Sequence, residues 1–503
     1  LASAGIMHGG EEQTFAYGYL AGSSLLSSLA MPNGIVRELS YEQRRDLAVA
    51  ISCRLGETVL VSRSQSYDAL GRPTARTQQR GTEATRTDSF SYNGRNELTG
   101  ATLGTAPYGY SYDNIGNRKT AQEIAEELTY TANNLNQYTR IEESGETPFV
   151  PTYDASGNQT LIKTSTGIWT VVYNAANRAV SFTSRDGNIV VECGYDYQGR
   201  RYMKKVTVNG TVASHERYLY RGYLQIAALD MLNSKNVHRT LLWDPLEPVA
   251  TRPLALVQEN ALYCYGMDFN KDVTEVFAGE GAVAATYDYS PYGTVTGTGN
   301  LVQPVQWSSE MNDHELALVY YNYRYYNPAD GRWINRDPIA EEGGWNLYGF
   351  VGSNSILETD ILGTAWSSLQ TEAGAALAAR QAAEAAAKAA ARAAGTAIAA
   401  ERSKKNKRCA ELYREKSEAK KEARGSSCKK MIIPECPTQD ECNIFNDRYE
   451  KMKRFAEARK AYDDECYQGG DAGHQKQREG WFEGAQNCKS KYDECITKIN
   501  QLV

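Results

Sequence analysis

The chain has 503 residues, of which 41% are hydrophobic and 23% charged, and its formal net charge is −6. This composition predicts several packed domains and excludes a largely disordered chain. The small net charge does not favour a protein that coats nucleic acid or a membrane surface. Tyrosine is unusually common, with 34 residues against 10 phenylalanines, and the chain has 42 glycines but only 14 prolines. This bias favours β structure with many turns.

The composition changes after Thr364. The last 139 residues contain 26 Lys and Arg against 21 Asp and Glu, a net charge of +5, whereas the first 364 contain 29 against 40, a net charge of −11. Of the 34 tyrosines 29 precede this point, and of the 10 cysteines 7 follow it. We therefore expect two different parts joined at this position.

The N-terminal region contains one short apolar stretch, Leu20–Ala30, which is interrupted by four serines and lacks a basic leader. It predicts neither a signal peptide nor a membrane-spanning helix. Because the first residue is Leu1 rather than Met, we expect the chain to begin inside a longer one. A missing leader therefore gives no information about export.

A unit of about twenty residues repeats along the first part of the chain. The best copies read Tyr-Asp-x-x-Gly followed by Arg or Asn. Seven copies, three of them degenerate, begin at Tyr67, Tyr92, Tyr112, Tyr130, Tyr153, Tyr173 and Tyr195. In each unit the aromatic residue leads into a turn, Asp or Asn caps the turn with its side chain, and Gly or Asn supplies a positive φ. The units therefore predict strand, turn and strand, and their stacking predicts a sheet that grows along the chain.

The residues between these turns support that prediction. The segments 171–173, 189–193 and 205–208 are rich in β-branched residues and partly alternate, as half-buried strands do. We expect the repeated tyrosines to be architectural rather than catalytic, because Tyr-Asp pairs commonly build turns.

The repeat resembles the YD repeats of the Rhs and teneurin-like proteins. Four later segments, 287–293, 318–328, 331–339 and 346–354, follow in the order of the core that closes Rhs shells, so that the resemblance extends over about residues 60–364. It implies a mainly β fold, in which a β-solenoid of YD repeats spirals into a hollow shell. It also implies that the shell encloses a variable C-terminal polypeptide, usually a toxin, which we expect to be an α-helical domain.

These features predict five parts. Residues 1–60 are expected to be the truncated start of the repeat shell, 61–285 the YD-repeat shell, and 286–364 the core with its self-cleavage segment. Residues 365–400 are expected to form an alanine-rich helical linker and 401–503 a cysteine-rich helical domain.

The resemblance also implies chemistry at the junction, because Rhs cores cut their own chain. On this interpretation Asp337 and Asp360 form an aspartyl pair, Arg336 tunes their charge, and the bond between Thr364 and Ala365 is cut. Hydrolysis by two carboxylates requires one ionised group to activate water and one protonated group to donate to the amide. The activity would be that of a single-turnover autoprotease.

The alternative interpretation of the same residues is structural. Arg336 and Asp337 then form an ion pair, and Asp360 caps the turn that leads to Gly363. Such ion pairs perturb pKa values without any catalytic role.

The tail begins with a helical pattern. Residues 373–400 contain 18 alanines, with charges spaced four apart, which predicts one long helix that acts as a linker. The mixed-charge run 401–425 is expected to continue this helix. Its basic residues either contact phosphates of nucleic acid or face solvent, and a solvated helical face is the simpler interpretation.

The tail is rich in cysteine. The seven residues are Cys409, Cys428, Cys436, Cys442, Cys466, Cys488 and Cys495. They form no Cys-x-x-Cys pair and are accompanied by a single histidine, so we expect no metal and no cofactor. They predict an exported, disulfide-stapled domain in which Cys488 and Cys495 share a helical face and one thiol is left over. The pairing cannot be derived from the sequence.

One further cluster lies in the tail, over residues 463–478, where acids and glycines accompany the histidine, and its candidate site residues are Asp471 and His474. Histidine with nearby acids suits general acid–base catalysis in RNA or phosphodiester cleavage. The alternative is a loop between two helices, with Asp471 as an N-cap and His474 in the first helical turn.

Two functions remain open. The first is a polymorphic toxin used in bacterial competition, whose shell encloses the tail as cargo and releases it after self-cleavage. Its partners would be an acidic immunity protein, a secretion apparatus or an upstream shell region, and, for the tail alone, nucleic acid. The second is a non-enzymatic surface or adhesion protein that displays the tail as a binding module. Either protein is expected to be secreted or located at the bacterial cell surface.

Overall fold

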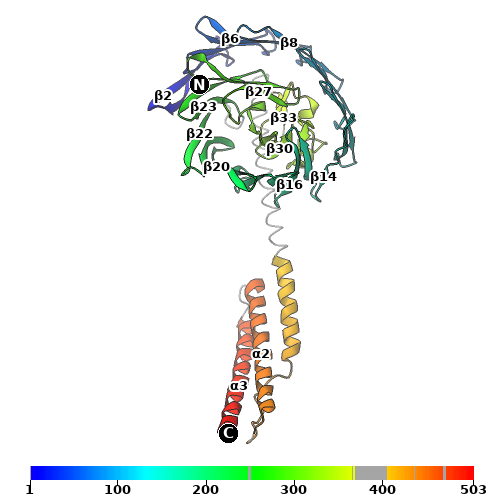
Figure 1. Cartoon of the computed structure of the whole chain (residues 1–503), viewed down its shortest axis with the longest axis vertical. Helices are drawn as coiled ribbons and strands as arrows, with labels where there is room; N and C mark the ends of the chain where they lie inside the picture. The colour runs from blue at the N-terminus through cyan, green and yellow to red at the C-terminus, as the bar shows by residue number, and fades with distance from the viewer. Residues whose placement is uncertain are drawn as a thin grey trace. The chain divides into compact units, whose positions relative to one another are not determined.

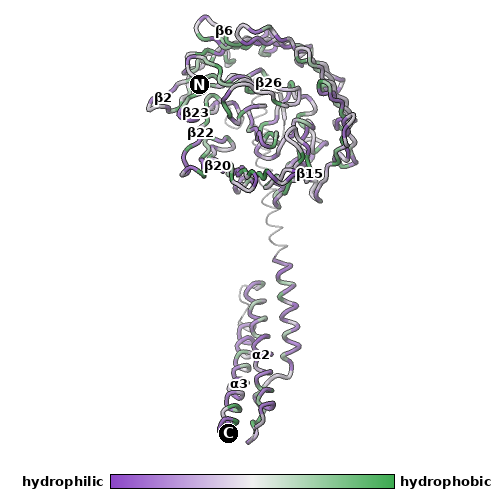
Figure 2. Tube along the Cα trace, in the orientation of Figure 1, coloured by the Kyte–Doolittle hydropathy of each residue, from purple (hydrophilic) through white to green (hydrophobic). Residues whose placement is uncertain are grey.

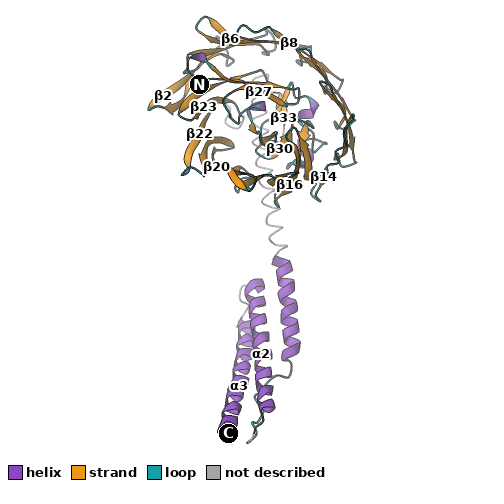
Figure 3. Ribbon diagram, viewed as in Figure 1, coloured by secondary structure: helices purple, strands orange, loops and turns teal. Residues whose placement is uncertain are grey.

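The computed structural model describes residues 2–246, 251–364, 366–368, 405–435, 437–467 and 472–502. The chain divides into two compact units, Leu1–Ala394 and Gly395–Val503, and each is considered by itself. The described part of the first unit consists of strands, and that of the second consists of helices (Figure 3).

Two large antiparallel sheets make up most of the first unit, and in both of them each strand pairs with its neighbours in the sequence. The first sheet contains thirteen strands of the described chain: β1 (Ser3–His8), β2 (Glu11–Tyr19), β3 (Leu26–Ala30), β4 (Ile35–Tyr41), β5 (Ala48–Leu55), β6 (Thr58–Tyr67), β7 (Pro73–Arg80), β8 (Arg86–Tyr92), β9 (Leu98–Leu103), β10 (Ala106–Tyr112), β11 (Arg118–Glu123), β12 (Glu126–Ala132) and β13 (Tyr138–Glu143). The second contains fourteen of them: β14 (Thr152–Tyr153), β15 (Gln159–Thr164), β16 (Gly167–Tyr173), β17 (Ala179–Ser184), β18 (Ile189–Tyr195), β19 (Arg201–Val208), β20 (Thr211–Arg221), β21 (Leu224–Asp230), β22 (Asn236–Trp243), β23 (Pro253–Gln258), β24 (Ala261–Met267), β25 (Val273–Phe277), β26 (Val283–Tyr289) and β27 (Val295–Gly299).

Two small sheets complete the strands of this unit. They are β28 (Met311–Asp313), β29 (Leu318–Tyr321), β30 (Arg324–Asn327) and β31 (Arg332–Trp333), followed by the pair β32 (Glu358–Asp360) and β33 (Trp366–Ser368). Short 3₁₀ turns lie at η1 (Gly279–Gly281), η2 (Trp307–Ser309), η3 (Ala340–Gly343) and η4 (Val351–Ser353). In Figure 1 the large sheets curve around β30 and β33. This arrangement confirms the predicted shell of YD repeats.

The turns are built as the repeat predicted. In the turn after β10, Asp113 accepts hydrogen bonds from the backbone N–H groups of Ile115 and Asn117, both at 2.9 Å, and Gly116 adopts a φ of +85°. The hydroxyl of Tyr112 donates to the carbonyl oxygen of Leu98 at 2.7 Å. In this turn the tyrosine therefore ties the turn to the neighbouring strand, and the acid closes the turn.

Hydrophobic and hydrophilic residues alternate along the strands (Figure 2). In β8 and β16 the buried positions are two residues apart, as expected for sheets with one covered face. The segments predicted as strands from their β-branched residues are parts of β16, β18 and β19.

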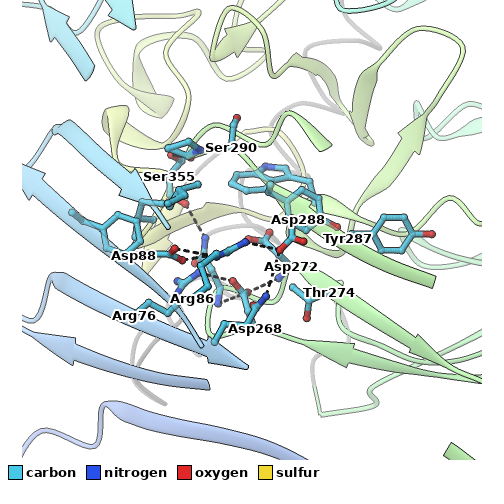
Figure 4. Close-up of a pocket in the computed structure, with 18 residues that line it drawn as sticks. Arg76, Arg86, Asp88, Asp268, Asp272, Thr274, Tyr287, Asp288, Ser290 and Ser355 are labelled. Atoms are coloured by element: carbon cyan, nitrogen blue, oxygen red, sulfur yellow. Dashed lines mark hydrogen bonds and ion pairs between the residues drawn. The ribbon is translucent and has the colours of Figure 1, made fainter. Parts of the chain in front are cut away.

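A network of ion pairs connects the two large sheets (Figure 4). Arg76 of β7 lies 2.9 Å from Asp268, and Arg86 of β8 lies 2.8 Å from Asp288 of β26. Arg80 contacts both Asp288 and the fully buried Glu275 at 2.8 Å. Because most of these side chains are partly or fully buried, the pairs fix the position of β25 and β26 against β7 and β8.

The turns of the repeats also hold the segment that carries β31 and the residues after it. The hydroxyl of Tyr348 donates to the carbonyl oxygen of Gly157 at 2.7 Å. Asn346 donates to the side chain of Asn117 at 2.9 Å. Arg332 donates to the carbonyl oxygen of Asn136, which lies in a third turn, at 2.6 Å. The row of turns is therefore the surface on which this segment docks.

The second unit contains a helix over 405–423, α2 (Gln439–Tyr467) and α3 (Ala472–Leu502), which confirms the helical tail. Three disulfides join Cys409 to Cys466, Cys428 to Cys488, and Cys442 to Cys495. The last two pairs use one face of α3, as predicted. Cys436 and the predicted helix over 373–400 lie outside the described residues.

This unit has its own core. Phe445, Met452 and Ala485 pack with the buried disulfides between α2 and α3, and the three cross-links all lie within the unit. Because this helical unit has its own core and its own disulfides, we expect it to fold independently of the first unit. Among the helices that the structure describes, none combines the length and the apolar character needed to cross a membrane.

The docking of the turns predicts the effect of a matched pair of glycine substitutions. Gly145 and Gly157 have nearly the same φ, +86° and +85°. A Cβ atom at Gly145 would meet nothing within 4 Å, whereas one at Gly157 would lie 2.7 Å from the hydroxyl of Tyr348. Gly145→Ala therefore costs only the backbone strain, about 1–2 kcal/mol, and Gly157→Ala adds a steric clash.

We expect Gly157→Ala to lower the thermal unfolding temperature further than Gly145→Ala, as measured by circular dichroism of the shell. Equal decreases for the two variants would contradict the docking of Tyr348 on this turn.

Candidate active site

A buried arginine lies at the centre of the residues around the junction. Arg324 is the first residue of β30, and its side chain is 3% exposed. Its Nη2 atom lies 2.9 Å from Oδ2 of Asp337 and 3.5 Å from Oδ2 of Asp360. One guanidinium thus brings together the two aspartates that the sequence predicted as a pair.

The remaining contacts of Arg324 fix its orientation. Its Nε atom donates to the carbonyl oxygen of Gly363 at 2.6 Å, and Nη1 donates to that of Leu347 at 3.3 Å. The guanidinium carbon also lies 4.1 Å from the ring centroid of Trp333, a cation–π contact. Burial lowers the pKa of Arg324, and the two carboxylates oppose this effect.

Asp337 follows β31 and is held by backbone contacts. Its Oδ1 atom accepts the N–H of Ile339 at 2.9 Å, and its own N–H donates to Leu347 at 2.9 Å. Oδ1 is therefore occupied by the backbone, and Oδ2 is the oxygen that contacts Arg324.

Asp360 is the last residue of β32 and caps the following turn. Its Oδ1 atom accepts the N–H groups of Leu362, Gly363 and Thr364 at 3.1, 2.7 and 3.1 Å. This is the cap that the structural interpretation predicted, and it coexists with the pairing through Arg324. Burial raises the pKa of Asp360, although Arg324 and the three N–H groups oppose the shift.

The carbonyl group of Thr364 lies close to Asp337. A Cβ atom at Gly343 would clash with the carboxylate of Asp337 and would lie 2.8 Å from the carbonyl oxygen of Thr364. Both groups therefore approach the same point, which only a glycine leaves open. Thr364 is 1% exposed, and within the described chain its buried hydroxyl has no hydrogen-bond partner. Ala365 lies outside the described residues.

Arg336 occupies a different place from the one predicted. Its side chain packs against Gly157 and interacts with Tyr348. The cation that the structure places on both aspartates is Arg324, which the sequence analysis did not single out. A signal was present, because an arginine within the aromatic strand-forming run 318–328 is expected to be buried and to need acidic partners.

Glu310 is a second residue that the sequence analysis missed. It is fully buried and accepts a hydrogen bond from the hydroxyl of Thr251. Burial raises the pKa of Glu310 to about 8, and the nearby charge of Asp360 adds to the shift while Lys271 opposes it. Glu310 is therefore expected to be mostly protonated at neutral pH.

His474 lies in the first turn of α3, as predicted, with Nδ1 3.3 Å from Oδ1 of Asp463. Asp471, its predicted neighbour, lies outside the described residues. In the part of the chain that the structure describes, no group of three or more His, Cys, Asp or Glu side chains is placed to hold a metal ion.

Comparison with known families agrees with the two-part organisation. A family model described as Teneurin YD-shell matches residues 28–356. A second model, described as Novel toxin 16, matches residues 407–491 of the tail.

Two curated relatives are similar over part of the chain. The tRNA3(Ser)-specific nuclease WapA of Bacillus spizizenii is 26% identical over 280 residues, which cover 53% of this chain and 11% of that protein. The toxin subunit YenC2 of Yersinia entomophaga is 29% identical over 177 residues, 33% of this chain and 16% of that protein. The chain thus spans less than a fifth of the length of either relative.

Solved structures share the fold. The crystal structure of TcdB2-TccC3-TEV matches with a TM-score of 0.57 at 20% identity, over 71% of this chain and 19% of that one. The Tc holotoxin pore of Photorhabdus luminescens matches with a TM-score of 0.50 at 19% identity, over 69% of this chain and 19% of that chain. Because the YD-shell model matches residues 28–356, well over half of the sequence, the chain belongs to the teneurin YD-shell family.

Proposed function

We propose that the chain is the C-terminal part of an Rhs-type polymorphic toxin, whose shell encloses the tail and cuts the chain once after Thr364. The observation that carries this proposal is the buried guanidinium of Arg324, which brings Asp337 and Asp360 together beside the carbonyl group of Thr364. The match of the tail to a toxin family supports the role of the tail as cargo.

The two carboxyl groups have environments that suit different roles. The ion pair with Arg324 at 2.9 Å favours the charged form of Asp337. Burial raises the pKa of Asp360, which favours its protonated form. Asp337 is therefore the base that activates water, and Asp360 is the acid.

The cleavage step then follows. Asp337 takes a proton from a water molecule, whose oxygen attacks the carbonyl carbon of Thr364. Arg324, whose Nε atom donates to the carbonyl oxygen of the preceding residue, Gly363, at 2.6 Å, supplies positive charge near the carbonyl oxygen on which negative charge develops. Asp360 gives its proton to the amide nitrogen of Ala365, and the C–N bond breaks. The products are a carboxyl group at Thr364 and an amino group at Ala365.

The environment of Thr364 supports the presence of the attacking water. A buried hydroxyl normally has a hydrogen-bond partner, and the Thr364 hydroxyl has none within the described chain. A water molecule next to the carbonyl group would satisfy it.

The other partners follow from this role. A tail of net charge +5 favours an acidic immunity protein that binds it through electrostatic steering. Three disulfides favour secretion or exposure at the cell surface, because they persist in oxidising surroundings. An upstream shell region would bring the protein closer to the length of its relatives, and a secretion apparatus would export it.

Substitutions that keep a polar side chain test the proposed site. Asp337→Asn, Asp360→Asn and Arg324→Gln each remove a charge or a proton that the reaction uses. We expect each to lower the cleavage rate by about 10²-fold or more, so that the 55.7 kDa chain persists on a denaturing gel. The cleaved fragments of the unchanged chain provide the reference.

Two controls separate this effect from a general loss of buried charge. Asp330→Asn removes a buried carboxyl group whose hydrogen-bond partner is Asn327 rather than Arg324. Arg336→Gln removes the cation that packs on Gly157. Both should still yield the two fragments. Cleavage of Asp337→Asn at the normal rate would contradict the mechanism. An unchanged chain that stays intact would favour the alternative, a YD-repeat surface protein that displays its tail.

The cleavage rate should depend on pH. The reaction needs the proton of Asp360, so the rate falls as pH rises through the raised pKa of this group. To measure this, the intact chain is isolated in denaturant and refolded at a series of pH values. The yield of fragments is then followed over time at each pH. A rate that rises steadily towards alkaline pH would contradict the assignment of the acid.

A further inference from the structure

The helical tail contains a pocket of about 800 Å³. It lies between the helix 405–423, the loop that follows it, α2 and α3. Three cationic side chains line it, Lys420, Lys429 and Arg459, and the acidic Glu483 lies at the same pocket. Trp481 supplies an aromatic wall. The pocket thus combines an aromatic surface with an excess of positive charge.

The aromatic wall is held in place from behind. The ring of Trp481 contacts that of Phe455 edge to face, with centroids 4.8 Å apart. Phe455 is 1% exposed, whereas Trp481 is only half-buried. The indole therefore has a fixed position and keeps an accessible surface at the pocket.

A buried carboxylate connects this pocket with the only histidine of the tail. Asp463 of α2 is 1% exposed, and its Oδ2 atom lies 3.6 Å from Nε of Arg459 and 3.3 Å from Nη1 of Arg478. Its Oδ1 atom lies 3.3 Å from Nδ1 of His474. Arg459 also lines the pocket, so this side chain links the pocket to Asp463 and, through Asp463, to His474 and Arg478.

This arrangement sets the chemistry of the imidazole. When Asp463 accepts a hydrogen bond from Nδ1 of the neutral ring, the lone pair that can take up a proton lies on Nε2. The His474 side chain is 41% exposed, so the ring is accessible to a large substrate. Two arginines on the same carboxylate place positive charge next to it, where a phosphate would lie.

We propose that the pocket binds single-stranded RNA and that His474 cleaves it. A base would stack on Trp481, and phosphates would contact Lys420, Lys429 and Arg459, as in single-strand-binding grooves. RNA is the class that fits, because its 2′-hydroxyl is a nucleophile within the substrate, so that one imidazole next to cations is sufficient. This inference deepens the proposed toxin role of the tail and is independent of cleavage at Thr364.

The proposed step is a transesterification. Nε2 of His474 takes the proton of the 2′-hydroxyl, and the 2′-oxygen attacks the adjacent phosphorus. Arg478 stabilises the charge on the phosphoryl oxygens. The bond to the 5′-oxygen breaks, and this oxygen takes a proton from water while the imidazolium returns its proton to solvent. The products end in a 2′,3′-cyclic phosphate and a 5′-hydroxyl.

The experiment uses the second unit, residues 395–503, exported to an oxidising compartment. A mass that shows three disulfides and a helical circular dichroism spectrum establish its folding. The probe is a fluorescein-labelled 20-nucleotide single strand of mixed sequence, prepared as RNA and as DNA. We expect cleavage of the RNA alone, with cyclic phosphate ends, and a decrease of about 10²-fold or more in rate for His474→Ala.

Binding is measured separately by fluorescence anisotropy in the His474→Ala background, over a range of salt concentrations. Lys420→Gln combined with Lys429→Gln should weaken binding and reduce the slope of log K against log salt by about 1.4, because each phosphate contact on a single strand contributes about 0.7. Ile444→Ala removes an exposed apolar side chain outside the pocket and should change neither measurement.

Three results would overturn the proposal: a folded unit that leaves RNA uncut, equal rates for the parent unit and His474→Ala, or equal cutting of RNA and DNA. In each case the cluster around Asp463 serves only to hold α2 and α3 together. Because the unit is tested without the shell, none of these results bears on self-cleavage.

Discussion

The proposed cleavage site depends on one buried charge. Arg324 lies in the aromatic strand β30, where an unpaired guanidinium would be strongly destabilising, and the two carboxylates of Asp337 and Asp360 compensate it. Removing one partner of a buried ion pair typically costs about 3–5 kcal/mol. The same electrostatic requirement that stabilises the fold therefore brings the two acids together.

The position of this site is set by the shell. The repeat turns present backbone and side-chain acceptors in a row, and Tyr348, Asn346 and Arg332 dock on three of them. These residues flank Asp337 and the loop to β32. The carboxylates therefore meet only when the segment is docked, so that in the proposed mechanism the chain is cut only after the shell has formed around it.

Local features of the sequence were sufficient to predict the repeats, because a YD turn is closed by residues within five positions of one another. The turn at Asp268 was missed, since Met267 and Lys271 replace the tyrosine and glycine, although Asp268 still accepts the N–H groups of Asn270 and Asp272. Of the three residues of the proposed cleavage site, Asp337 and Asp360 follow from the motifs of the sequence and Arg324 does not.

What escaped the sequence analysis is long-range. The partner of both aspartates proved to be Arg324 rather than the adjacent Arg336, because β30 crosses next to them only in the folded core. The same holds for the three disulfides, whose partners are 53 to 60 residues apart.

The most direct test of the central claim is the intact mass of residues 1–503 after folding, recorded under denaturing conditions. We predict two fragments that meet between Thr364 and Ala365, with a new carboxyl group on the first and a new amino group on the second. A single species of 55.7 kDa, or fragments that meet at another bond, would contradict the assignment of Arg324, Asp337 and Asp360 as a self-cleavage site.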